Sequence, residues 1–222
     1  MSKFFRLYKD FFNSKDNKNQ HHLTPLELRI VIAIEEQKSV LREDSVFHIE
    51  SLLFLMHKTI NKRNKELVKE GIYSLQDKDI IEVSTQEKDV YVTKMIFGQE
   101  RDAPFEKIFM KELHYIMSEL KSDSLIYLYL SIKAWEFNDE YVSFSYDAIS
   151  NICQVSKRTA QRQVKQLEDL SLIEVTRYSY AKNRIKTLGF KFCDAEVSSV
   201  VALKPVETVE EKHERIKRVF GE

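Results

Sequence analysis

Hydrophobic residues recur with helical spacing in the second half of the chain and then change to strand spacing. In SYDAISNICQVSKRTAQRQVKQLEDLSLIEV, residues 145–175, Ala160, Val164 and Leu167 fall at the i, i+4 and i+7 positions that form the buried stripe of an amphipathic helix. A shorter helix precedes this one, with a tight turn between them. The pattern predicts two packed helices, of which the second begins at Ser156 and carries its polar residues on the outer side.

The residues that follow alternate between apolar and polar on both sides of a short basic turn. This segment is IEVTRYSYAKNRIKTLGFKF, residues 173–192, and the alternation predicts a β-hairpin. Lys182, Asn183 and Arg184 are expected at its tip. The predicted order is therefore helix, turn, helix and basic hairpin.

The first half of the chain repeats this arrangement at an offset of about 100 residues. Matching positions include Leu28, Ile30 and Ile32 with Leu128, Leu130 and Ile132, Thr59 with Thr159, Lys62 with Arg162, Lys65 with Lys165, and Leu67 with Leu167. The predicted elements of the first unit are a helix that starts at Thr24-Pro25 and runs to Gln37, helices over Phe47–Met56 and Thr59–Glu70, and strands over Ile80–Ser84 and Val90–Ile96. Gly71 is expected to end the third helix. In the second unit, a helix is expected from about Ser122 to Phe137.

The fold class expected from these elements is mostly α with small β-hairpin wings (α+β), in two tandem domains. The boundaries are an aromatic N-terminal segment 1–20, a first domain 21–97, a linker 98–105, a second domain 106–192, and a C-terminal tail 193–222. The linker is placed at FGQERDAPF because it contains both a Gly and a Pro.

Both ends of the chain contain segments with helical character. The N-terminal segment has a dense group of apolar residues in a helix-prone stretch: Phe4, Phe5, Leu7, Tyr8, Phe11 and Phe12. It is expected either to dock on the first domain or to contact a protein partner or a second copy of the chain. At the other end, TVEE at residues 208–211 predicts the capping box of an amphipathic helix.

Composition narrows the range of functions. With 4 Gly and 3 Pro in 222 residues, the chain has no glycine-rich phosphate loop, and 2 Cys are too few for a disulfide framework or a cysteine-based zinc site. No apolar run is long enough to span a membrane. We expect a cytoplasmic protein in which Cys153 is a buried thiol, with no cofactor and no metal.

Catalytic motifs are also missing from the sequence. The 6 His form no HExxH motif, the adjacent pair His21-His22 lacks the intervening residue of a His-hydrophobic-His metal motif, and no GxSxG elbow occurs. We therefore do not expect an enzyme.

The formal net charge of zero conceals an uneven distribution. Residues 156–191 contain nine Lys and Arg residues and three acids, a local charge of +6. Residues 57–96 contain eight Lys and Arg residues and seven acids, a local charge of +1. The local field governs attraction to a phosphate backbone. The second domain is therefore expected to carry most of the affinity for DNA.

The signature S-K-R-T-x-x-R-x-x-x-x-L-x-x-x-x-L-I-x-V from Ser156 to Val175 resembles the winged helix-turn-helix superfamily of DNA-binding proteins. The duplicated layout, which has no separate sensor domain, is similar to that of plasmid replication initiators built from two winged helices. This resemblance implies two tandem winged-helix domains, with dimerisation in residues 21–97 and the reading of origin repeats in residues 106–192.

The resemblance also implies roles for individual residues. Ser156 would cap the recognition helix beside a phosphate, Arg158 and Arg162 would contact guanine, Gln161 would contact adenine, and Lys157 and Lys165 would touch phosphates. Lys182 and Arg184 would reach the backbone or a minor groove. The remaining candidates for DNA contact are Arg177, Lys186, Lys58, Lys62, Arg63 and Lys65.

Three functions remain open from the sequence. The first is a sequence-specific duplex-DNA binder of a plasmid or phage that initiates replication. The second is a transcriptional regulator that uses the same surface. The third is a winged-helix interaction module that does not bind DNA but recruits a protein partner.

Overall fold

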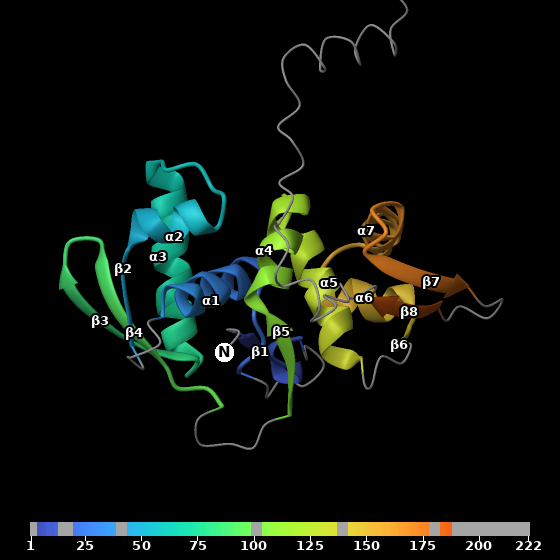
Figure 1. Ribbon diagram of the computed structural model, residues 1–222, viewed down its shortest axis with the longest axis horizontal. Helices are drawn as coiled ribbons and strands as arrows, with labels where there is room; N and C mark the ends of the chain where they lie inside the picture. Colours follow the sequence, from blue (N-terminus) through green and yellow to red (C-terminus); the bar gives the residue numbers. More distant parts are fainter. Residues whose placement is uncertain are drawn as a thin grey trace, which may run out of the picture. The chain divides into compact units, whose positions relative to one another are not determined.

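Helices and short antiparallel strands alternate along the chain (Figure 1). The structure is a computed structural model that describes residues 4–12, 20–38, 44–98, 104–136, 142–177 and 183–187. Within these ranges the helices are η1 (Lys9–Phe12, a 3₁₀ helix), α1 (Pro25–Gln37), α2 (Ile49–Leu55), α3 (Lys62–Asp77), α4 (Met110–Glu119), α5 (Asp123–Trp135), α6 (Tyr146–Cys153) and α7 (Lys157–Asp169). The strands are β1 (Phe4–Tyr8), β2 (Asp44–His48), β3 (Ile81–Glu87), β4 (Val90–Met95), β5 (Phe105–Phe109), β6 (Val142–Phe144), β7 (Ile173–Arg177) and β8 (Asn183–Thr187). The predicted α+β class is confirmed.

One order of elements occurs twice. The first unit runs α1, β2, α2, α3, β3, β4, and the second runs α5, β6, α6, α7, β7, β8. The sheets also match, because their strand orders are β2-β4-β3 and β6-β8-β7, so the last strand of each unit lies in the middle. The internal repeat predicted from the sequence is thus present in the order of elements and in the sheet topology.

The offset between α3 and α7 is smaller than the expected 100 residues. The buried positions of α3 are Val68, Gly71, Ile72 and Leu75, and those of α7 are Ala160, Gln163, Val164 and Leu167. These two sets differ by 92 residues at every position. Helix α3 has 16 residues and α7 has 13, and the additional residues of α3 lie at its start.

Gly71 does not end the third helix, contrary to the prediction. It is buried inside α3, where a Cβ atom would collide with the Cδ1 atom of Ile30 on α1. Glycine therefore allows a close approach of the two helices at this point. The helix ends instead at Asp77, and the chain then turns at Asp79, whose φ is 54°, while the Ile80 N–H donates to the Leu75 carbonyl at 3.0 Å.

The end of α7 repeats this closure. Ser171 has a φ of 56°, and the Leu172 N–H donates to the Leu167 carbonyl at 3.0 Å. A hydrogen bond across the last turn together with a left-handed residue is the Schellman arrangement, which glycine usually provides. In these two helices the left-handed residues are Asp79 and Ser171. The positions of glycine in the sequence therefore do not predict either helix end.

The first helix begins as predicted. The Thr24 hydroxyl accepts from the Glu27 N–H at 3.3 Å, and the Glu27 carboxylate accepts from the Thr24 N–H at 2.6 Å, which completes a capping box at the start of α1. The helix expected over Phe47–Met56 begins later, at Ile49, because Phe47 belongs to β2 and pairs with Tyr91 of β4.

The N-terminal segment forms a strand and a 3₁₀ helix, not the expected helix. Strand β1 pairs antiparallel with β5, a partner about 100 residues away, and Phe105 thereby belongs to a strand and not to a linker (Figure 1). Five of the six apolar residues are buried within their own chain: Phe5, Leu7, Tyr8, Phe11 and Phe12. Docking on the first domain, one of the two expectations, is only part of what the structure shows. Strand β1 pairs with β5, β1 and η1 pack on α5 of the second domain, and Tyr8 and Phe11 also contact Phe97 of the first domain.

Helices α1 and α5, which occupy the same position in the two units, pack against each other at the centre of the core. Both helices are buried along most of their length, from Glu27 to Ile34 and from Leu125 to Ile132. All described residues lie in one compact unit that spans residues 1–188. The C-terminal helix expected after Thr208 lies outside the described residues.

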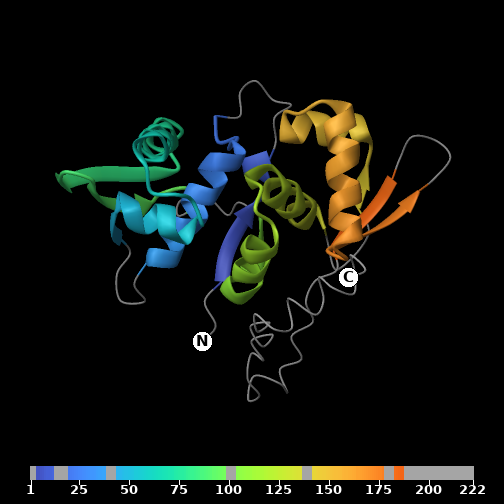
Figure 2. The same cartoon turned by 90° about the horizontal axis from the view of Figure 1, so that it is seen from above.

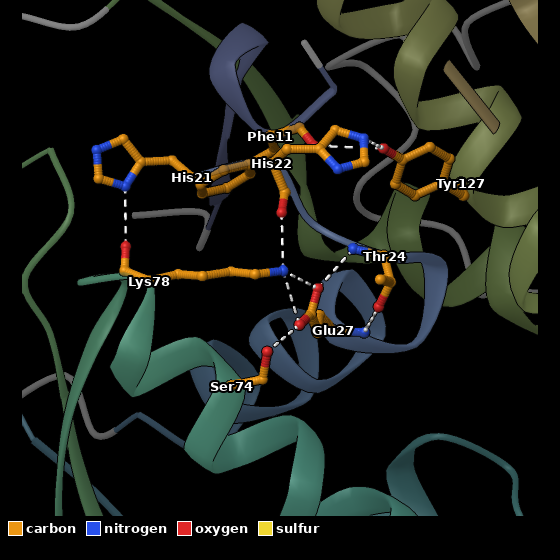
Figure 3. Close-up of polar contacts among 8 residues, drawn as sticks. All are labelled: Phe11, His21, His22, Thr24, Glu27, Ser74, Lys78 and Tyr127. Carbon is orange, nitrogen blue, oxygen red and sulfur yellow. Dashed lines mark hydrogen bonds and ion pairs between the residues drawn. The ribbon is translucent and has the colours of Figure 1, made fainter. Parts of the chain in front are cut away.

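A buried ion pair joins the start of α1 to the end of α3 (Figure 3). Glu27 is 5% exposed, and its carboxylate accepts hydrogen bonds from Lys78 Nζ at 2.7 and 2.8 Å and from the Ser74 hydroxyl at 2.6 Å. Lys78 also donates to the His22 carbonyl at 2.9 Å. The Tyr127 hydroxyl on α5 donates to the Phe11 carbonyl at 3.3 Å, so the second unit reaches the N-terminal segment here.

These hydrogen bonds change the acidity of Glu27. Burial by itself would raise the pKa of its carboxyl group, but the hydrogen bonds from Lys78, Ser74 and the Thr24 N–H outweigh this effect and hold the pKa below its ordinary value. Glu27 is therefore charged at neutral pH, and its ion pair with Lys78 is intact.

A second ion-pair group links the two units directly. Arg29 on α1 is 2% exposed, and its guanidinium donates to Asp123 Oδ1 at 2.7 Å and to the Met56 carbonyl. Lys58 donates to the other oxygen of Asp123, also at 2.7 Å. The first residue of α5 is thus held by α1 and by the turn that follows α2.

We expect Glu27→Gln to lower the free energy of unfolding by about 3 kcal/mol at pH 7, because it leaves Lys78 without its charged partner. The pKa of Glu27 is lower in the folded chain than in the unfolded chain. Its contribution is therefore complete above the unfolded pKa and is lost as the pH falls through the folded pKa. Urea unfolding as a function of pH measures this difference.

The matched control is Glu119→Gln, since Glu119 is exposed at the end of α4. It should change the unfolding free energy by less than about 0.5 kcal/mol. A loss of similar size in both variants, or a Glu27→Gln loss that does not decline at acidic pH, would contradict the role of this ion pair.

Candidate nucleic-acid interface

Two capped helices form the start of the candidate site. The Ser145 hydroxyl accepts from the Ala148 N–H at 3.1 Å and caps α6, while the Ser156 hydroxyl accepts from the Thr159 N–H at 3.2 Å and caps α7. Between them Gln154 has a φ of 52°, which turns the chain within three residues. The predicted helix, tight turn and second helix from Ser156 are confirmed (Figure 2).

The buried side of α7 contains the three predicted apolar residues. Ala160, Val164 and Leu167 are each 0% exposed, and α7 packs against α5 and α6. Gln163 is also buried, and its Nε2 donates to the Ser124 hydroxyl at the start of α5 at 2.6 Å. Hydrophobic spacing did not reveal Gln163, because a polar residue gives no apolar signal. Its position three residues after Ala160 and four before Leu167 could have shown it.

The opposite side of α7 is basic and exposed. Every predicted contact residue of this helix lies there with its side chain in solvent: Ser156, Lys157, Arg158, Gln161, Arg162 and Lys165. Positions separated by three and four residues lie on one helical face, so the four from Arg158 to Lys165 form a continuous strip. The structure therefore brings these candidates together on one surface.

Most cations on this face are free of acidic partners. Within the described ranges, Arg158, Arg162 and Lys165 have no carboxylate at ion-pair distance. Lys157 pairs with Asp147 of α6 at 2.9 Å, but both side chains are more than half exposed. Exposed ion pairs of this kind contribute little to stability, so a phosphate can replace Asp147 at small cost.

Thr159 has a structural role at the start of α7. Its hydroxyl lies 2.9 Å from the Ser156 hydroxyl, and its side chain is half-buried. This placement agrees with a residue that closes the first turn of the helix.

Three strands stand beside these helices. Strand β8 lies between β6 and β7, with Arg177 opposite Asn183 and Arg184 opposite both Thr176 and Ser143. Asn183 and Arg184 therefore belong to β8 and not to the tip of the hairpin, which corrects the prediction. Lys186 also lies in β8, and Lys182 lies outside the described residues.

The corresponding face of α3 carries different charges. Aligning the two buried stripes by their 92-residue offset places Glu66 opposite Arg158 and Glu70 opposite Arg162. Tyr73, which is 48% exposed, takes the position of Lys165. The two arginines that dominate the α7 face are thus replaced by acids in the first unit.

The lysines of the first unit are mostly held by carboxylates. Lys65 pairs with Glu50 of α2, and this hydrogen bond with Lys65 lowers the pKa of Glu50. Lys69 lies 2.7 Å from Asp89, and the hydrogen bond between them raises the pKa of Lys69. With Lys58 bound to Asp123, two of the four first-unit candidates are engaged in ion pairs.

Lys62 and Arg63 differ from these paired residues. They are exposed on the additional first turn of α3, and neither has an acidic partner in the part of the chain that the structure describes. Because they lie on this additional turn, the 92-residue offset does not match either of them to a residue of the exposed α7 face. The structure therefore does not gather the four first-unit candidates into one cationic surface.

Cys153 is a buried thiol, as predicted. It is 3% exposed on the inner side of α6, and burial raises its pKa to about 12. Its sulfur is therefore protonated at neutral pH and is not a ready nucleophile.

No protein-family model matches this chain, and neither does any curated protein. Within the described ranges, no helix has the length and apolar character needed to cross a membrane.

The two sides of α7 should respond differently to truncation. We expect Leu167→Ala to lower the free energy of unfolding by about 3 kcal/mol, because it leaves a cavity beneath the helix. Arg162→Ala should change it by less than about 0.5 kcal/mol, since this side chain is exposed and has no described carboxylate partner. Chemical denaturation of the purified variants measures both values, and a large loss from Arg162→Ala would show that its face is buried.

Proposed function

We propose that this protein binds duplex DNA in a sequence-specific manner by placing α7 in the major groove. The observation that supports this is the strip of exposed cations on α7, directly opposite its buried stripe. The major groove of B-DNA is wide enough for an α-helix, and the cations Arg158, Arg162 and Lys165, which have no described carboxylate partner, can attract phosphates.

Each side chain on the strip has a contact that suits its chemistry. Arg158 and Arg162 each present a planar fork that matches the O6 and N7 acceptors of guanine, and Gln161 can bond adenine in the same two-point way. Lys157 and Lys165 lie at the borders of the strip, where phosphates would meet the helix. The N-terminus of α7 at Ser156 offers free N–H groups to a further phosphate.

The strands that follow α7 would add contacts outside the groove. Arg177 belongs to β7, and Arg184 and Lys186 belong to β8. We propose that these three residues and Lys182, which lies outside the described residues, touch the DNA backbone or an adjacent minor groove. In this proposal each unit is a winged helix, and its last two strands are the wing.

We further propose that the biological role is initiation of replication on a plasmid or phage-type element. The duplicated order of elements supports this, together with the difference in charge between α7 and α3. One unit would read origin repeats, while the other, with Lys62 and Arg63 among its exposed cations, would act mainly as an interface with a second copy of the chain. Regulation of transcription from the same surface is the alternative.

The test is binding to duplex fragments from the flanks of the gene, measured by fluorescence anisotropy at several salt concentrations. Arg158→Ala with Arg162→Ala should weaken binding to the preferred fragment about 100-fold, because each bidentate contact with guanine contributes about 1–3 kcal/mol. Binding to random duplex should weaken less, since it relies on phosphate contacts. Lys165→Ala should lower the salt slope by about 0.9.

A matched control removes the same charge from the first unit. Lys62→Ala with Arg63→Ala should change affinity for the preferred fragment less than tenfold if α7 is the reading helix. Equal losses in the two double variants would contradict the assignment to α7. A footprint over direct repeats would favour replication, and a footprint over a promoter would favour transcription.

A further inference from the structure

The two-stranded sheet β1–β5 has one buried face and one exposed face. Phe5, Leu7 and Ile108 point into the core and are at most 2% exposed. Because side chains alternate along a strand, the residues between them point to the other side. Phe4 and Phe109 on that side are 37% and 48% exposed.

The strand register arranges the outer face in three rows. Phe4 lies opposite Phe109, Arg6 lies opposite Lys107, and Tyr8 lies opposite Phe105. Successive rows are separated by two residues, or about 6.7 Å. The order across the sheet is therefore aromatic, cationic and aromatic.

The cationic row has no described counter-charge. Arg6 and Lys107 face each other directly, which is unfavourable for like charges, and in the described residues neither forms an ion pair with a carboxylate. Glu106, the only acid in these two strands, lies opposite Leu7 on the other face. An anion placed between Arg6 and Lys107 would relieve this repulsion.

The cations rest on the aromatic rings instead. Arg6 Cζ lies 5.2 Å from the centre of the Phe105 ring, and Lys107 Nζ lies 5.2 Å from the centre of the Phe4 ring. Cation–π contacts at exposed positions contribute only about 0.5–1 kcal/mol. Both side chains can therefore move toward a phosphate and leave the ring faces open to another planar group.

Tyr8 closes one end of this face. It is 5% exposed, packs against Phe97 with ring centres 4.9 Å apart, and lies so close to Gly98 that a Cβ atom there would collide with its hydroxyl. The rings that remain accessible are those of Phe4, Phe105 and Phe109. Three accessible rings on one face of a sheet offer stacking positions of the kind that RNA-binding sheets use for two or three bases.

We propose that the outer face of β1–β5 binds single-stranded nucleic acid. Unpaired bases would stack on Phe4, Phe105 and Phe109, and the backbone phosphates would lie between Arg6 and Lys107. A duplex does not fit this chemistry, because its bases are already stacked on one another, whereas every unpaired base offers a flat face to an aromatic ring. This activity is separate from the duplex binding proposed for α7.

Charge and shape favour this ligand over a protein partner. The cationic row interrupts the apolar surface, so the face lacks the continuous apolar patch that a protein core contact needs. An acidic peptide could neutralise Arg6 and Lys107, but it would have no planar groups for three exposed rings.

The experiment measures anisotropy of a labelled 12-nucleotide thymidine strand with the full chain. Phe4→Leu with Phe109→Leu keeps the faces apolar but removes the rings, and it should weaken binding at least about tenfold, because stacking contributes about 1–3 kcal/mol per base. Arg6→Gln with Lys107→Gln should lower the salt slope by roughly 1.4. The same variants should bind the duplex fragment within about twofold of the parent chain.

The α7 variant separates the two activities. Arg158→Ala with Arg162→Ala should keep its affinity for the single strand while losing its affinity for the duplex. If the parent chain binds the single strand but no duplex at all, the result still supports this site. Loss of single-strand binding in the α7 variant, with no loss in the Phe4 and Phe109 variant, would overturn the proposal. Poly-glutamate that displaces the strand equally well from the parent and the leucine variant would overturn it too. Circular dichroism confirms that each variant is folded.

Discussion

The burial of one stripe of α7 determines which of its residues can meet another molecule. Ala160, Val164 and Leu167 pack against α5 and α6, and Gln163 is bound to Ser124, so the helix cannot rotate without exposing apolar surface. The cations must then lie on the solvent side as one strip. Since α5 in turn packs on α1, the orientation of the candidate interface depends on the shared core of the two units.

The same buried stripe recurs in α3, 92 residues earlier, but the outer face of α3 carries different charges. Glu66 and Glu70 stand where α7 has arginines, and the nearby lysines are bound by Glu50, Asp89 and Asp123. Two copies of one architecture thus share their packing and differ in their surface charge. Fold is set by the buried positions, whereas recognition is set by the exposed ones, so duplication allows one copy to change its partner without a change of fold.

Local patterns were sufficient to predict that both units contain these helices and that the α7 cations face outward, but they placed the end of α3 at Glu70 instead of Asp77. The Thr24 capping box, the Ser156 cap and the apolar spacing from Ala160 all act within a few residues. The N-terminal strand could not be predicted in this way, because its helix-prone composition is overruled by pairing with β5 about 100 residues away. The ion pair of Lys58 with Asp123 could not be predicted for the same reason, since no local pattern relates residues 65 positions apart.

The central claim is that α7 meets duplex DNA, and amide hydrogen exchange with and without a flanking duplex fragment tests it most directly. The first N–H groups of α7 have no acceptor within the helix and exchange readily when free. DNA is expected to slow exchange at residues 157 and 158, whereas the Thr159 N–H is already bonded to the Ser156 hydroxyl, and to leave the equivalent start of α3 unchanged. Slowed exchange at α3 alone, or none in either helix under conditions where the fragment is bound, would contradict it.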